Sequence, residues 1–120
     1  MASPETIVAE VRTEFEGLLA ETLGVEAQGM TLDSMERQVF RRVLDLGRGL
    51  LRLFVAQRAQ ATRQPAVVTP AGVTLAYHSE RKRTYGSLFG AVPLERPYFY
   101  ERAQGGYAPL DGLLSLPAGK

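Results

Sequence analysis

The sequence predicts an α+β fold: an antiparallel helical hairpin with a long second helix, then a small antiparallel β-sheet and a turn-rich tail that carries leucines. Apolar residues recur every three or four positions over the first half of the chain. Alternating apolar and polar residues, prolines and glycines follow residue 65. We therefore expect the hairpin over residues 1–64 and the sheet with its tail over residues 65–120. The whole chain, 120 residues with 45% hydrophobic and 22% charged residues, has the size and composition of one folded domain.

The first helix is predicted over residues 4–23. Ser3 is a suitable N-cap, Pro4 suits the first helical position, and Glu5 favours the positive end of the helix dipole. We expect Gly24 to end the helix in a left-handed conformation. Six apolar residues recur on one side of this segment: Ile7, Val8, Val11, Phe15, Leu18 and Leu19.

A longer second helix is predicted from Thr31 or Leu32 to about residue 62, after a short turn over residues 25–30. Its apolar stripe consists of Leu32, Met35, Val39, Val43, Leu46, Leu50 and Phe54. Thirty helical residues extend roughly 45 Å, so the shorter first helix is expected to cover only the first two-thirds of this stripe. The remainder needs another cover, from the C-terminal part of the chain or from a second copy; it comprises Leu46, Leu50, Leu53 and Phe54.

Two glycines, Gly47 and Gly49, lie inside this helix, where each costs about 1 kcal/mol relative to alanine. Gly47 falls near the edge of the apolar stripe, where a missing side chain permits another element to approach closely. A kink is the alternative explanation, and the sequence leaves both open. Pro65 then prevents the helix from continuing.

Strands are predicted at residues 73–79, 82–89 and 92–100, with Gly90 and Ala91 forming the tight turn between the last two. Pro93 and Pro97 cannot donate hydrogen bonds to a ladder, so we expect the third strand to lie at an edge or to have one side unpaired. The tail offers apolar side chains for docking: Leu110, Leu113, Leu114 and Leu116.

The composition excludes several classes of function. The chain has no cysteine and a single histidine, His78, which excludes thiolate metal sites and paired-histidine catalysis. No apolar run reaches the length of about 20 residues that spans a bilayer, and the first residues are acidic rather than basic. We therefore expect a cytoplasmic protein with no metal, no cofactor and no membrane partner.

Two groups of basic residues are candidates for nucleic-acid contact. The first is a row on the second helix, opposite its apolar stripe: Arg37, Arg41, Arg48 and Arg52. Such a row can follow a phosphate backbone, but it can also be a solvated face whose arginines pair with Asp45 or with acids of the first helix. The second group combines bases with aromatic rings on the sheet, namely Arg81, Lys82, Arg83 and Arg96 beside Tyr85, Tyr98 and Tyr100. It suits phosphate contact and base stacking, or equally cross-strand packing of the tyrosines.

Two further residues have structural interpretations. His78 stands beside Ser79, but adjacent residues of a strand point to opposite faces, so a catalytic relay is not expected. We expect a surface or half-buried histidine instead. Asp111 is expected to cap the turn over residues 112–116.

One region carries a resemblance to a known family. Residues 83–100 contain a Phe89-Gly90-x-Val92 turn and an Arg96-x-Tyr98-Phe99 strand. A second segment follows, with Gly106, Pro109, Leu110, Asp111, Leu114 and Leu116 at characteristic spacing. This order resembles the region ahead of the catalytic domain in bacterial insertion-sequence transposases of the ISKra type. The helical part, with Leu32, Glu36 and Gly47, is compatible with that family but much less specific.

The chain departs from the family pattern in two ways. Glu101 to Gln104 stand where the family places a Cys-x-x-Cys pair, so its zinc ribbon does not carry over. The sequence also ends before a catalytic domain with clustered carboxylates, so we expect no transposase chemistry from it. The resemblance implies a non-catalytic DNA-binding or assembly module that contacts transposon ends. The alternative is a protein-interaction module that forms homodimers, or docks on a larger transposase chain, through the second helix.

Overall fold

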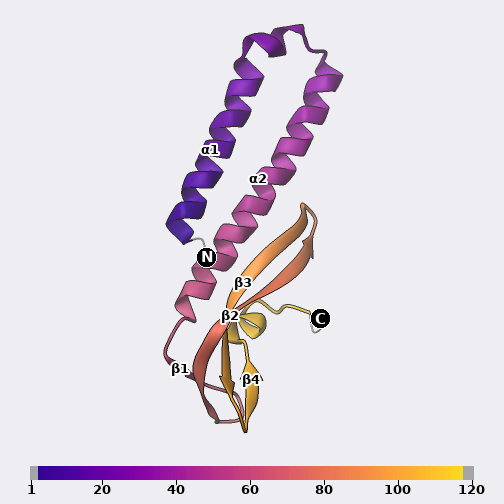
Figure 1. The fold of residues 1–120 in the computed structure, drawn as a ribbon. Helices are drawn as coiled ribbons and strands as arrows, with labels where there is room; N and C mark the ends of the chain where they lie inside the picture. The colour runs from indigo at the N-terminus through magenta and orange to yellow at the C-terminus, as the bar shows by residue number, and fades with distance from the viewer. Residues whose placement is uncertain (1–2, 118–120) are drawn as a thin grey trace.

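The computed structural model describes residues 3–117 and has the α+β architecture that the sequence predicts (Figure 1). Two antiparallel helices form an arm, and a four-stranded antiparallel sheet packs beside one end of it. The molecule measures 65 × 26 × 17 Å, with a radius of gyration of 19.1 Å. A compact domain of this length has a radius of about 14 Å. The arm therefore extends well beyond the part of the chain that folds around a core.

Helix α1 spans Pro4–Leu23 and helix α2 spans Leu32–Ala61, which confirms both predicted helices. The Ser3 and Thr31 hydroxyls cap them by accepting hydrogen bonds from backbone N–H groups. The prediction for Gly24 was wrong, because its backbone is extended, with φ −73° and ψ 167°. The connection that follows is a short 3₁₀ helix, η1, at Val25–Gly29.

The sheet has the order β1-β2-β3-β4, formed by Ala66–Val68, Thr74–Ser87, Gly90–Glu101 and Gly105–Tyr107. The two strands predicted at 73–79 and 82–89 are one long strand, β2, whose pairing with β3 is interrupted by a bulge at His78. The predicted turn was displaced by two residues. Leu88 and Phe89 form the loop, while Gly90 pairs with Ser87 and has φ +111°.

Strand β3 accommodates its prolines as expected from their missing N–H groups. It pairs with β2 along its whole length but with β4 only at residues 99–101. Within residues 3–117, the other side of β3 is therefore unpaired at Pro93 and Pro97, in agreement with the predicted strand geometry.

The core lies between the sheet and the C-terminal half of α2. The sheet and the short helix α3, at Pro109–Leu113, contribute Leu75, Val92, Leu94, Phe99 and Leu110, and the two long helices contribute Ile7, Ala56 and Ala59. From Val8 to Leu46 no residue is buried. The distal arm in Figure 1 thus has no core of its own.

Gly47 lies directly beneath the tip of the β2–β3 hairpin. A Cβ at this position would come within 2.7 Å of the Phe89 Cγ atom. Helix α2 runs through Gly47 and Gly49 without interruption. Close approach, rather than a kink, explains the glycine at position 47.

Candidate interaction surfaces

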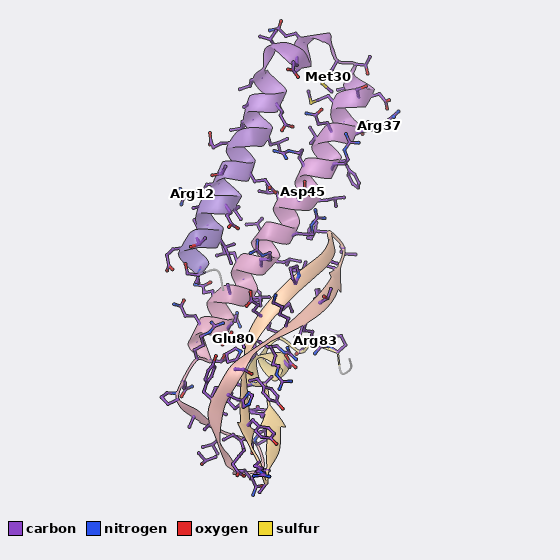
Figure 2. The ribbon with its side chains drawn as sticks, viewed as in Figure 1. Arg12, Met30, Arg37, Asp45, Glu80 and Arg83 are labelled. Carbon is purple, nitrogen blue, oxygen red and sulfur yellow. The ribbon has the colours of Figure 1, made fainter. Side chains whose placement is uncertain are left out.

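Two of the predicted phosphate-binding arginines are engaged inside the protein. Arg96 Nε lies 2.5 Å from Asp111 Oδ1, and Arg83 Nη1 lies 3.4 Å from Asp111 Oδ2. Arg83 also donates a hydrogen bond to the Pro117 carbonyl (Figure 2 labels Arg83 beside the C-terminal segment). The Arg83 and Arg96 side chains are only 12% and 15% exposed. Asp111 is therefore an ion-pair partner that ties α3 to the sheet. It is not the predicted cap of residues 112–116, because it lies inside α3 and its carboxylate accepts from the two arginines.

The other two bases of the sheet, Arg81 and Lys82, are exposed. The Arg81 guanidinium lies over the Tyr98 ring, 4.0 Å from its centroid. Lys82 is opposite Glu95 in the strand register. Arg81 thus stays beside an aromatic surface with its charge open to solvent.

His78 joins Tyr98 and Tyr100 in a cluster of rings. The ring centroids of the two tyrosines are 6.4 Å apart at 22°, and His78 meets both edge-on at 6.0 and 5.5 Å. The expectation that His78 and Ser79 point to opposite faces was wrong, because the bulge removes the alternation and their side chains contact each other at 2.9 Å. Tyr85 lies farther along β2, away from this cluster, with Val92 opposite.

Sequence reasoning missed a polar cluster centred on Glu80 (labelled in Figure 2). Its carboxylate accepts hydrogen bonds from Arg63, at 2.6 and 3.3 Å, and from the Tyr77 hydroxyl at 3.0 Å. Desolvation, followed by the hydrogen bond and negative charge of Glu80, raises the pKa of Tyr77 above its usual value. The cluster joins the end of α2 to β2. No sequence spacing indicates it, since Arg63 lies in a connection.

The arginine row of α2 is largely paired. Arg37 binds Asp33 at 2.5 Å, and Arg52 lies 3.4 Å from Glu10 of α1. Arg48 binds Asp45 and donates to the Phe89 carbonyl at 2.5 Å, which fastens the sheet to α2. The acid partners of Arg48 and Arg52 are those named by the solvated-face interpretation, although Arg48 also contacts the sheet. Arg41 is exposed.

In the described part of the chain, helix α2 is covered by α1 on one part of its surface and by the sheet on another, and a third part is left uncovered. One side meets α1, where Arg42 binds Glu21 and Gly49 lies against Val11. A second side meets the sheet through Ala59 and the Phe89 tip. The third side is the apolar stripe, in which Leu50 is 50% and Phe54 46% exposed. The prediction that α1 covers the first two-thirds of this stripe was wrong, because Leu32 and Val43 are exposed as well.

Helix α1 extends this apolar surface. At about 100° per residue, the exposed residues of the α2 stripe are rotated by roughly 80–140° from Arg42 and Gly49, which contact α1. Phe15 and Leu19 are exposed, and are rotated by a similar angle, in the same sense, from the residues of α1 that contact α2. Because the helices are antiparallel, the two rotations lead to the same side of the hairpin. We call this surface the hairpin face; it comprises Phe15, Leu19, Leu32, Val43, Leu50 and Phe54, with Leu46 and Leu53 half-buried along it.

Residues 3–117 gather no set of three histidine, aspartate or glutamate side chains able to hold a metal ion. Within the same residues, no helix combines the length and apolar character needed to cross a membrane.

Comparisons with protein-family models, with curated proteins and with solved structures each find no match for this chain. The resemblance to ISKra-type transposases therefore stays a prediction from its motif residues.

Proposed function

We propose that this chain is a non-catalytic assembly module that pairs with a second copy of itself through the hairpin face. The observation that carries this proposal is the open third side of α2, where Val43, Leu50 and Phe54 are exposed although their spacing is typical of helix-to-helix packing. Exposed apolar patches of this kind mark interaction sites. The proposal keeps the cytoplasmic location expected from the sequence.

The size of the hairpin face supports a protein partner. Two helices of 20 residues side by side, each about 10 Å wide and about 30 Å long, present roughly 600 Å² in projection. A standard stable interface buries about 800 Å² of accessible surface on each partner. The projected area of the face is thus of the same order as one side of a standard interface, and a dimer would give the distal arm the core that it lacks.

The apolar character of the hairpin face favours a second copy as the partner. The arginine row of α2 lies on the opposite side of the helix, where Arg37, Arg48 and Arg52 already pair with acids of the same chain. A two-fold axis makes each surface meet its own copy. Crossing the hairpins so that α1 of one copy lies on α2 of the other would bury the two apolar faces against each other, as in a four-helix bundle.

Sedimentation equilibrium of the full chain tests this proposal. We expect wild-type protein to have twice the 13.2 kDa mass of one chain, and the V43E/L50E variant to be a monomer with unchanged circular dichroism. Both positions are exposed in the single chain, so the variant retains its fold. Leu113→Glu, an exposed leucine of α3 away from the hairpin face, is the matched control and should leave the dimer intact. Wild-type protein that stays monomeric at high concentration, or a V43E/L50E variant that still dimerises, contradicts the proposal.

A further inference from the structure

The ring cluster on the sheet has two exposed rings and one ring that is held by neighbouring residues. His78 and Tyr100 are exposed, whereas Tyr98 is half-buried. The Tyr98 ring lies across the backbone of Gly106, where a Cβ would come within 2.7 Å of Tyr98 Cε1. Arg81 covers another part of the same ring. Tyr98 is thus fixed as the base of the cluster, and Tyr100 and His78 present ring surface to solvent.

This exposure is not required by the core of the sheet. Tyr77, on the neighbouring position of β2, packs edge-on against the fully buried Phe99 at 5.9 Å. His78, the next residue of β2, lies instead against the half-buried Tyr98 and the exposed Tyr100. Three rings therefore gather at the surface although aromatic side chains contribute most to stability when they are buried.

Positive charge borders the cluster on one side. Arg81 lies on Tyr98, and Arg96 donates to the Arg81 carbonyl at 3.3 Å. Arg96 and Arg83 share a single carboxylate, that of Asp111, so this group keeps one net positive charge. An anionic ligand with flat rings could stack on the aromatic cluster and place its negative charge beside the arginines.

We propose that the cluster of His78, Tyr98 and Tyr100 with Arg81 binds single-stranded nucleic acid by stacking an unpaired base on its open rings. Every nucleobase has a flat π face that stacks on aromatic side chains, and basic residues beside the rings hold the phosphate backbone. The bases of a duplex are already stacked on one another and present only their edges in the grooves. This inference goes beyond the proposed function and does not depend on dimer formation.

Fluorescence anisotropy of labelled oligonucleotides at low ionic strength tests the proposal on the full chain. We expect oligothymidylate or oligouridylate to bind, and an abasic strand of the same length and charge, as well as a duplex, to bind at least about tenfold more weakly. The DNA and RNA arms identify the sugar that is preferred, and binding in either arm supports the proposal. Equal binding of the abasic strand, or no binding of any single strand, would overturn it.

Tyr100→Ala is the decisive variant, because Tyr100 is exposed and its removal leaves the core unchanged. Stacking on an aromatic side chain contributes about 1–3 kcal/mol per base, so we expect the affinity to fall about 5- to 150-fold. Tyr85→Ala is the matched control: both tyrosines are 39% exposed on the same pair of strands, but Tyr85 has no ring neighbour among the described residues. It should change the affinity less than about twofold. An equal loss in both variants, or no loss in Tyr100→Ala, contradicts the proposed site.

Discussion

Phe89, at the tip of the β2–β3 hairpin, packs its ring against the backbone of Gly47 in the middle of α2. This contact and the Arg48 hydrogen bond to the Phe89 carbonyl hold the sheet on the helix. Alanine at position 47 would favour the helix by about 1 kcal/mol but would overlap the ring, and such overpacking costs about 1–3 kcal/mol. We expect Gly47→Ala to lower the free energy of unfolding, measured by urea denaturation.

A second background separates the overlap from any effect of the helix itself. In a Phe89→Ala protein the ring is gone, and only the helix propensity of alanine remains. There, Gly47→Ala should raise the free energy of unfolding by up to about 1 kcal/mol. The same destabilisation in both backgrounds would show that the glycine serves another purpose.

The helices could be predicted closely because local signals determine them. Ser3 and Thr31 cap both helices, and the apolar spacing is continuous between the caps and the ends. The strands were predicted less well, since β1 and β4 have only three residues each, too few for an alternation to be recognised. The bulge at His78 also breaks the period of two in β2, which divided one strand into two in the prediction.

The candidate surfaces depended on contacts that spacing does not reveal. Arg83 and Arg96 belong to a basic cluster in sequence, yet Asp111, 28 and 15 residues away, neutralises part of it once α3 docks on the sheet. The open side of α2 was predicted only in part. Periodicity shows that a stripe exists, but the rotation of α1 around α2 decides which residues it covers.

Asp111→Asn should destabilise the docking of α3. The carboxylate accepts from two guanidinium groups that are 12% and 15% exposed, and its loss leaves both positive charges poorly compensated. Removing one partner of such a charged hydrogen-bond group costs about 1–3 kcal/mol. Urea unfolding of the variant measures this loss.

Asp33→Asn is the matched control for that variant. Its partner Arg37 is 71% exposed, and Asp33 itself is 66% exposed, so water replaces the lost interaction. Exposed ion pairs of this kind contribute about 0.3–0.5 kcal/mol. If the two variants lose equal stability, the Asp111 group is no more important than a surface ion pair.

Tyr77 should be the source of a late step in alkaline titration. Its hydroxyl donates to Glu80, and desolvation together with this carboxylate raises the pKa of Tyr77 in the folded state. A raised pKa favours the protonated phenol, so the hydrogen bond stabilises the fold below the unfolded-state pKa of about 10. That contribution disappears as the pH rises through the folded-state pKa. The ultraviolet absorbance of tyrosinate, recorded against pH, should lose its last step in Tyr77→Phe.

Glu80→Gln distinguishes the role of the negative charge from that of burial. Glutamine keeps an oxygen that accepts the phenol hydrogen bond but removes the charge that opposes ionisation, so the pKa of Tyr77 should fall. The difference in unfolding free energy between wild type and Tyr77→Phe should also shrink as the pH rises through the last absorbance step, because ionised Tyr77 no longer donates. A last absorbance step that persists in Tyr77→Phe would belong to another tyrosine. A last step that keeps its pH in Glu80→Gln would show that the Glu80 charge does not raise the pKa of Tyr77.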